Sequence, residues 1–494
     1  LHLGGRSLPH AVMMMVPEAW QNHKTMLDEK KAFYEYHSCL MEPWDGPALL
    51  PFTDGTFVGA LLDRNGLRPA RWMLTSDRQV ILASETGVIE VPPEKILRKG
   101  RLEPGRMFLI NIEEGRIVED QEIKEQMSRR QPYRSWLNDH ILELNDLPAP
   151  NEAVIPRVDN LVEQQNLFGY TLEDIRIVMK PMAFSGIEAL GSMGVDTPIA
   201  VLSDRPQLVY NYFKQLFAQV TNPPLDAIRE ELVTSTITNI GSAGDLFGET
   251  PEHCRLLKLK HPILLNSRLQ QIRECTETGV KAVTIPMHFP LAEGGPGLRA
   301  GLATLCEKAV QAILEQKATI LILSDRGAAE DRMPIPALLA TSAVHHHLIR
   351  KGLRSKCGIV VETAETREVH HFACLLGYGA GAVNPYLAFE TIGQMVKDRL
   401  YMDNEKSKEI DTDKAIANYI KAVEKGVVKV MSKMGVSTLQ SYRGAQIFEV
   451  IGLNQEVIEH YFTGTPSRIS GAGLDELAEE IRMRHDRAYP PVHV

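Results

Sequence analysis

Three short apolar runs recur in the middle of the chain at nearly constant spacing, and this spacing constrains the fold more than any other feature. The runs cover residues 281–286, 318–324 and 358–362, so they begin 37 and 40 residues apart. The intervening stretches carry apolar residues at three- and four-residue spacing, which is typical of amphipathic helices. One strand and one helix fit each interval, and such alternation predicts a parallel α/β sheet or barrel.

Other apolar runs, at residues 198–203, 262–265 and 379–383, extend the predicted sheet. Several of the predicted strands end in polar pairs, which are Ser203-Asp204, Ser324-Asp325 and Glu362-Thr363. Because the carboxyl ends of parallel strands face the ligand-binding side in such folds, we expect these pairs to lie at a functional edge.

The flanking regions have a different character. Within residues 1–120, apolar runs alternate with Asp-Gly, Asn-Gly and Glu-Gly turns, which predicts antiparallel hairpins. A charged stretch after residue 120 predicts a linker with helical segments up to residue 165. Residues 405–433 and 474–485 are predicted helices, separated by a loop-rich region.

Charge and cysteine content exclude several classes of protein. The net charge is −9, from 54 basic and 63 acidic residues, and no basic block is present. This balance excludes nucleic acid and anionic membrane surfaces as partners. No apolar run approaches the ~18 residues of a membrane span. The six cysteines are scattered without C-x-x-C spacing, which indicates neither a disulfide framework nor a cysteine zinc site and fits a reducing cytoplasm.

Two glycine-rich runs, at residues 293–301 and 377–385, raise the question of phosphate binding. The first lies between a predicted strand and a predicted helix, where backbone amides and the helix dipole attract anions. It matches neither G-x-x-x-x-G-K-[ST] nor G-x-G-x-x-G. Glycines that permit a tight turn or close packing are therefore the favoured interpretation of both runs.

Histidine and cysteine clusters are weak candidates for a metal site or a nucleophile. The run 345–347 contains three histidines, but consecutive helical residues point about 100° apart and cannot share one face. Residues 370–371 add two histidines, with Glu362 as a possible partner, and a polar helix surface remains the favoured interpretation. Residues 252–254 read Glu-His-Cys, but adjacent side chains rarely form a working nucleophile and base, so chance is the better account.

The turn at residues 63–71 is a stronger candidate. It reads Asp-Arg-Asn-Gly-Leu-Arg-Pro-Ala-Arg, and its residues of interest are Asp63, Arg64, Asn65, Gly66 and Arg68. Asn-Gly favours a tight turn, and the following proline sets the exit direction. Arginine recognises carboxylates through two parallel hydrogen bonds. Both a binding site and an ion-paired hinge remain open for this turn.

With its neighbours, this turn resembles the glutamate synthase large subunit family. The resembling phrases lie in order at residues 3–10, 16–20, 41–47, 63–71, 82–88, 217–224, 323–327, 441–446 and 461–468. They cover essentially the whole chain. The resemblance implies four parts: the carboxyl-terminal part of the glutaminase domain (1–120), a helical linker (121–165), the central domain (166–485) and the start of a further linker (486–494).

The fold implied by the resemblance is a partial N-terminal-nucleophile αββα sandwich followed by a barrel-like α/β central domain that binds no FMN. In this family, glutamine is hydrolysed and its ammonia travels inside the protein to 2-oxoglutarate, where the imine is reduced to glutamate. FMN and an iron–sulfur cluster are implied outside this chain. The electron donor is ferredoxin, or NAD(P)H through a partner subunit carrying FAD. The implied location is the cytoplasm, or the plastid in a eukaryote.

The site residues of the family transfer poorly to this chain. The family nucleophile is a cysteine at the mature N-terminus, whereas Leu1 stands here and Cys39 is internal. Asn65-Gly66 belongs to a later phrase than the oxyanion Asn-Gly pair of the family. We therefore expect no catalytic, cofactor-binding or metal-binding residue in this chain, and a structural role for the turn at residues 63–71. Leu1 is expected to lie inside a domain whose chemistry is encoded upstream.

The resulting hypothesis is a scaffold that couples the glutaminase and synthase sites and helps to wall the ammonia path, inactive by itself. One alternative is a natural stand-alone subunit that pairs with a separate chain carrying the nucleophile. Another is a barrel enzyme that uses Ser324-Asp325 and Glu362 on a phosphorylated ligand.

Overall fold

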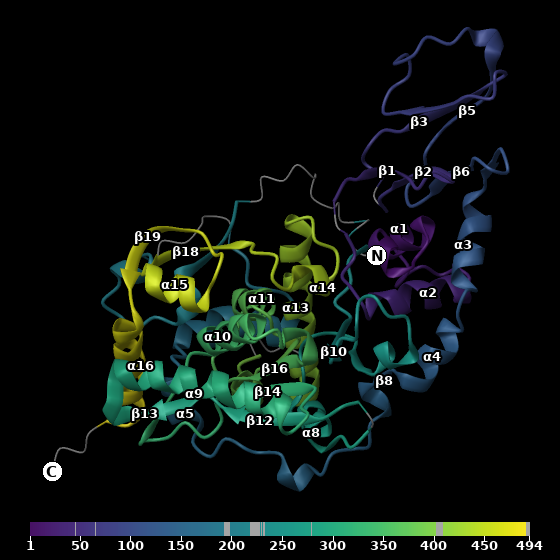
Figure 1. Cartoon of the computed structure of the whole chain (residues 1–494). Helices are drawn as coiled ribbons and strands as arrows, with labels where there is room; N and C mark the ends of the chain where they lie inside the picture. The colour runs from purple at the N-terminus through teal and green to yellow at the C-terminus, as the bar shows by residue number, and fades with distance from the viewer. Residues whose placement is uncertain are drawn as a thin grey trace.

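Helices and strands are mixed throughout the molecule, which confirms the α/β class (Figure 1). The computed structural model describes residues 1–44, 46–64, 66–191, 198–217, 228, 230, 233–277, 279–401 and 409–490. The buried apolar residues of this part form separate clusters. One cluster contains residues between Val12 and Leu256, most of them within the first 140 positions. The largest cluster contains residues between Leu167 and Ala488. We call the region of residues 1–140 the amino-terminal unit and the region around the largest cluster the central unit.

An antiparallel sheet of order β1-β2-β6-β7 organises the amino-terminal unit. Its strands are β1 (Leu49–Thr53), β2 (Phe57–Leu62), β6 (Met107–Asn111) and β7 (Arg116–Val118). The hairpins β1–β2 and β6–β7 confirm the antiparallel prediction. Position 59 of β2 requires glycine, because a Cβ there would come within 2.5 Å of the Phe52 ring on β1.

Helices and a second small sheet complete this unit. The helices are α1 (Leu8–Met15), α2 (Asp28–Ser38), α3 (Asp120–Ser128) and α4 (Tyr133–His140). The second sheet has the order β4-β3-β5, from β3 (Arg71–Thr75), β4 (Val80–Ala83) and β5 (Ile96–Arg101). Figure 1 shows β3 and β5 at the end of the unit that is farthest from the central unit.

The predicted helical linker is confirmed in its secondary structure. α3 and α4 are followed by β8 (Leu142–Glu143) and α5 (Leu161–Leu167). β8 pairs with β11 (Leu256–Leu259), which pairs with β10 (Thr238–Gly241), so the linker is attached to a later part of the chain. A π-helical turn at Asp174–Met179 leads into α6 (Lys180–Ser185).

A parallel sheet of order β12-β14-β16-β17 lies at the centre of the central unit. Its strands are β12 (Ala282–Pro286), β14 (Ile320–Ser324), β16 (Gly358–Glu362) and β17 (Ala382–Asn384). The connecting helices are α9 (Gly294–Leu314), α10 (Ala337–Arg350) and α11 (Val369–Gly377), preceded by α8 (Asn266–Glu274) and followed by α12 (Tyr386–Lys397). Every residue of β14, β16 and β17 is buried, which explains why these strands read as continuous apolar runs.

The barrel expectation is not confirmed. In the described residues β12 and β17 are the end strands of the four-stranded sheet, and they do not pair with each other. The predicted strand at 262–265 extends the sheet only by one bridge, from Ile263 to Val383. The predicted strand at 198–203 is wrong, because a 3-10 turn occupies Ala200–Leu202. Pro198 lacks an amide hydrogen for a ladder, and Leu202 is exposed rather than packed in a sheet.

The carboxyl-terminal region adds helices and a further sheet. The helices are α13 (Thr412–Lys433), α14 (Leu439–Tyr442), α15 (Gln455–Tyr461) and α16 (Leu474–Ala488). α13 confirms the helix predicted at residues 405–433 from residue 412 onward, and α16 confirms the helix predicted at residues 474–485. The sheet has the order β19-β18-β9, from β9 (Phe213–Gln215), β18 (Phe448–Leu453) and β19 (Ser467–Ala472). A short pair, β13 (His288–Pro290) with β15 (Arg332–Pro334), flanks the parallel sheet. No helix in the described part of the chain has both the length and the hydropathy needed to span a bilayer.

Candidate functional site

The turn that follows β2 is held by its own backbone. Asp63 is buried, and its carboxylate accepts from the Ala48 amide at 3.3 Å. The Asp63 carbonyl accepts from the amides of Gly66 and Gly105, each at 3.1 Å. Gly66 has φ +60°, and a Cβ there would lie 2.4 Å from the Pro104 ring. The sequence-predicted tight turn is therefore present, although Asn65 lies outside the described residues.

The two predicted arginines of this turn have different environments. Arg64 is half-buried, and its guanidinium donates to the hydroxyl of Ser437, which is 373 residues away in the sequence. Arg68 is exposed. The Arg64 contact joins two parts of the chain that lie far apart in the sequence.

Further hydrogen bonds join the amino-terminal and central units around Arg64. Gln440 Nε2 donates to the Ser38 carbonyl at 2.7 Å, and Ser441 Oγ donates to the Pro43 carbonyl at 2.9 Å. An ion pair lies nearby, with Lys258 Nζ 2.6 Å from Glu35 Oε1. These contacts connect α2 and the residues just after it with β11 and the segment around α14, and we call this group of polar contacts the seam.

A small cavity lies within this seam. Its volume is about 40 Å³, and both units contribute lining residues, among them Met14, Trp20, His37, Arg64, Ile237 and Gln440. A water molecule needs roughly 10–15 Å³ of such space, so the cavity has room for molecules the size of water or ammonia. Its wall combines apolar side chains with a larger number of polar ones, among them the charged Glu35, Arg64 and Lys258.

A buried pair of histidines lies beside the seam. His10 Nε2 and His37 Nε2 are 2.7 Å apart, and Glu249 Oε1 is 3.8 Å from each. His37 Nδ1 is 2.7 Å from the Phe33 carbonyl and must donate to it, so in the neutral pair His10 Nε2 is the donor and His37 Nε2 the acceptor. Burial, and then the charges of Arg130 and Arg6, lower the pKa of His10 to about 3.

This cluster is the only group of three histidine, cysteine or carboxylate ligands close enough for a metal ion within the described residues. Two nitrogens bound to tetrahedral zinc at ~2.0 Å would lie roughly 3.3 Å apart. The observed 2.7 Å is instead the length of a hydrogen bond. Sequence reasoning missed the cluster because Glu249 lies 212 positions beyond His37, and no local pattern marks either residue.

The sequence-predicted histidine and cysteine groups are structural. His345 Nδ1 accepts from Arg354 Nε at 2.9 Å, and His370 Nε2 lies 3.1 Å from the Tyr210 carbonyl. His253 is held by the Asp245 carbonyl at 2.7 Å and does not activate Cys254, which is fully buried. Cys39 is also buried, and contact with the Cys254 thiol together with burial raises its pKa well above the usual range. A protonated, inaccessible thiol is a poor nucleophile.

The polar ends of β14 and β16 come together as predicted. Thr363 Oγ1 donates to Asp325 Oδ2 at 2.6 Å, and burial raises the pKa of Asp325 to about 7. Glu362 is paired with Arg326 Nε at 2.7 Å and with Arg273. The charges of Glu362, Arg326 and Arg273 neutralise one another inside the protein. The predicted Ser203-Asp204 pair follows a 3-10 turn and lies apart from this edge of the sheet.

The glycine-rich runs serve packing. The glycines of 293–301 form the start of α9 itself, where a Cβ on Gly295 would lie 1.8 Å from Asp475 Oδ1 of α16. A Cβ on Gly381 would lie 2.6 Å from the Ile240 side chain. Each glycine therefore permits a close approach between elements.

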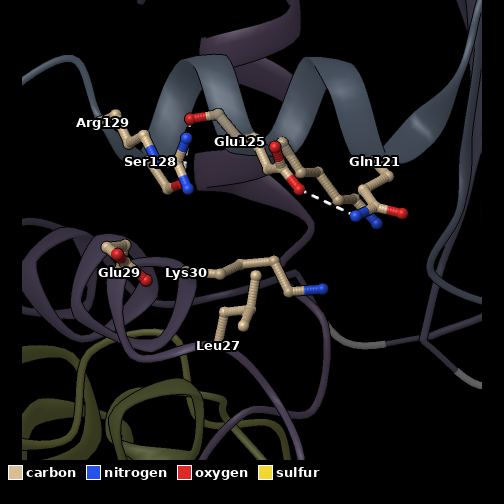
Figure 2. Close-up of a pocket in the computed structure, with 8 residues that line it drawn as sticks. Leu27, Glu29, Lys30, Gln121, Glu125, Ser128 and Arg129 are labelled. Atoms are coloured by element: carbon tan, nitrogen blue, oxygen red, sulfur yellow. Dashed lines mark hydrogen bonds between the residues drawn. The ribbon is translucent and has the colours of Figure 1, made fainter.

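A larger cavity of about 220 Å³ lies between α2 and α3, outside the seam. Figure 2 shows Lys30 facing α3, where Gln121 donates to Glu125 Oε1 at 2.8 Å. The buried charge of this cavity, Lys124, is neutralised by Glu18 at 2.7 Å and Asp120 at 2.8 Å. This pairing stabilises the α2–α3 contact, and we assign no binding role to the cavity.

Comparison with known proteins gives two family matches, and each match covers one of the two regions that meet at the seam. The family described as class-II glutamine amidotransferases matches residues 1–136, and the glutamate synthase central domain matches residues 163–454.

Among curated proteins, the glutamate synthase [NADPH] large chain of Bacillus subtilis is 50% identical over 99% of this chain. The glutamate synthase [NADH] of Schizosaccharomyces pombe is 46% identical, and ferredoxin-dependent glutamate synthase 2 of Synechocystis is 44% identical, each over 98% of the chain. The chain spans 31%, 23% and 32% of the lengths of these relatives. Among solved structures, the match to the flavin-binding domain of baker's yeast flavocytochrome b2 covers 64% of this chain and 99% of that domain. Its TM-score is 0.28 and its sequence identity is 10%, so the match is too distant to inform the fold.

Proposed function

Because the chain belongs to the glutamate synthase family, we propose that it forms the junction between the glutaminase and central parts of such an enzyme. The observation that carries this proposal is the seam itself. Two regions that match different family domains meet through Arg64, Ser437 and Gln440, and enclose a cavity of about 40 Å³. The proposed domains are the carboxyl-terminal part of an N-terminal-nucleophile glutaminase sandwich (1–120), a linker (121–165), the central domain (166–485) and the start of a further linker (486–494).

The reaction of the parent enzyme is the conversion of glutamine, 2-oxoglutarate and a reductant into two molecules of glutamate. In this reaction ammonia must move between two sites without escaping into solvent. The cavity in the seam is large enough for ammonia and is lined by side chains of both units, so we assign it to the wall of that path. Asp63, Arg64, Asn65, Gly66 and Arg68 are then a structural motif of the glutaminase part, in which Arg64 lines the cavity and Asn65 lies outside the described residues.

The chemistry of the parent enzyme lies in other parts of the protein. We propose that the cysteine nucleophile, the oxyanion Asn-Gly pair, FMN and the iron–sulfur cluster belong to parts of the parent enzyme outside the region matched by this chain. A barrel-like, FMN-free form of the central domain is part of the same proposal. The relatives are named for NADPH, NADH and ferredoxin, so the electron donor is either ferredoxin or a flavin subunit that uses a nicotinamide, in the cytoplasm or a plastid.

The stand-alone subunit is the less favoured alternative. Each of the three relatives matches 98% or more of this chain within one longer polypeptide. This chain itself matches both family domains. A separate nucleophile-bearing partner is therefore not needed to explain the sequence. The phosphate-using barrel enzyme is also disfavoured, because Asp325 and Glu362 are buried and satisfied by their own neighbours.

The proposal is tested by the coupling between the two half-reactions in the full-length enzyme. Replacing Arg64 by Ala removes the contact with Ser437 and opens the cavity wall. We expect glutamine hydrolysis to continue, while free ammonium rises and the glutamate formed per glutamine consumed falls. Arg71→Ala, an exposed position eight residues beyond Asp63, is the matched control and should retain the normal ratio. An unchanged ratio in the Arg64→Ala enzyme would contradict the role of the seam.

A further inference from the structure

A cavity of about 570 Å³ lies in the central unit, beside the loop that follows β16 and remote from the seam. Its wall is formed by the end of α5, the following loop, residues 205–211, the segment 367–371 and α16. Ligand sites in proteins commonly measure ~300–1,000 Å³, so this cavity has the volume of a small-molecule site. It also lies where ligands bind in parallel α/β folds, near the carboxyl end of a central strand.

Four arginines converge on this cavity. They are Arg205, Arg367, Arg484 and Arg487. Arg367 and Arg484 are 5% and 4% exposed, whereas Arg205 and Arg487 are exposed at the rim. Residues 484 and 487 are three positions apart on α16 and therefore share one face of the helix. Like charges at this spacing repel each other.

The two buried guanidiniums are positioned by backbone carbonyls. Arg367 donates to the Gly169 carbonyl at 2.7 Å and lies over the Tyr170 ring at 4.4 Å. Arg484 donates to the Gln207 carbonyl at 2.6 Å. The Nε of each arginine is buried and has no hydrogen-bond partner among the described residues. Arg367 also donates through Nη1 to the carbonyls of Glu365 at 3.0 Å and Phe168 at 3.3 Å, so each guanidinium is held in place by the backbone around it.

Three carboxylates line the cavity beside the four arginines. Asp174 is paired with Arg367 at 3.2 Å, and Glu368 is paired with His371 at 3.1 Å. Glu173 lies exposed at the rim. Behind the wall, Glu365 and Glu480 act on Arg484, yet burial still lowers the pKa of that guanidinium. Within the described residues, the side chains of Arg205 and Arg487 have no ion pair, so both charges are available to a ligand.

We propose that this cavity binds a small dianion, a molecule that carries two acidic groups as carboxylates or as phosphate. Guanidinium groups recognise both through parallel hydrogen bonds, and a buried pair held by the backbone, with two exposed arginines at the rim, suits a compact doubly charged ligand. Arg367 and Arg484 form the fixed floor of the site, and Arg205 and Arg487 close over the ligand. This site is independent of the ammonia path, since it shares no lining residue with the cavity in the seam.

The experiment measures anion binding to the full-length enzyme by isothermal titration calorimetry at constant ionic strength. Inorganic phosphate and succinate are the two probes, and chloride is the monovalent control. We expect saturable binding of at least one probe, and the stronger of the two identifies the acid group that the site prefers. The Arg205→Ala/Arg487→Ala double variant should bind it about tenfold more weakly or worse, because two charged hydrogen-bond donors are lost. Both positions are exposed, so the fold should be retained.

The matched control is Arg482→Ala on the same helix. Arg482 is exposed but pairs with Glu479 at 2.6 Å and Asp486 at 3.2 Å, and it does not line the cavity. Its variant should bind the probe as the wild type does. Two results would overturn the proposal: absence of saturable binding of both probes, or equal affinity in the wild type and the double variant.

Discussion

At the scale of single residues, the turn after β2 depends on a backbone conformation that glycine adopts without strain. Gly66 has φ +60°, and its amide donates to the Asp63 carbonyl at 3.1 Å. The space beside it is filled by Pro104, whose ring and Cα both lie close to where a Cβ would stand. Two separate effects, backbone strain and overlap with a rigid ring, therefore oppose any other residue.

We predict that Gly66→Ala lowers the free energy of unfolding by about 2–4 kcal/mol, from the left-handed backbone and the overpacking together. Gly87→Ala provides the comparison. Gly87 has φ +90° with open space around it, so only the backbone contributes and the loss should be about 1 kcal/mol. Urea denaturation of both variants measures the difference. Equal losses would show that Pro104 moves aside and that the turn is less rigid than described.

At the scale of elements, the glycine-rich start of α9 is a contact surface for α16. α16 packs against both α9 and α5, and it carries two of the arginines of the anion cavity. Gly295 is the point of closest approach, since a Cβ there would lie 1.8 Å from Asp475 Oδ1 and 3.0 Å from Asp475 Cα. The absence of a side chain at this position therefore sets how closely the two helices meet.

A double-mutant cycle tests this contact. Gly295→Ala should destabilise the protein by about 1–3 kcal/mol, because α16 must shift away from α9. Asp475→Ala removes the side-chain oxygen that the new methyl group meets, so the double variant should recover most of that loss. Thermal and urea unfolding provide the four free energies of the cycle. Strictly additive effects would contradict a direct contact between residues 295 and 475.

The strands of the central sheet could be predicted because they are buried on both faces, which leaves continuous apolar runs in the sequence. The runs at 281–286, 318–324 and 358–362 correspond to β12, β14 and β16 within two residues. Residues 198–203 have the same apolar composition but form a turn against β18, a tertiary contact that no local pattern records. The motif at residues 63–71 draws attention to Arg64, whereas no pattern in the sequence points to its partner Ser437, since 373 residues separate them.

At the scale of the whole molecule, buried histidines couple stability to pH. Burial lowers the pKa of His10 to about 3, of His345 to about 2 and of His346 to about 4. In the unfolded chain a histidine has a pKa of about 6.5, so the unfolded state binds more protons between that value and the folded one. Stability from these groups is therefore present above pH ~6.5 and is lost as the pH falls. Asp325 acts in the opposite direction, because its folded pKa is raised to about 7.

The contribution of His10 can be isolated, since it is fully buried and its proton uptake opposes folding throughout this range. From a folded pKa of about 3, it should account for about 2 kcal/mol of the stability lost between pH 7 and pH 5. His10→Gln removes the titrating group, so the variant should lose about 2 kcal/mol less than the wild type over that interval, whatever its stability at pH 7. His460→Gln, at an exposed position, is the control for the change from histidine to glutamine. Urea denaturation at the two pH values gives all the free energies required. If the wild type and the His10→Gln variant lose the same amount, His10 becomes protonated in the folded protein, and the His10–His37 hydrogen bond then cannot be the neutral one assigned here.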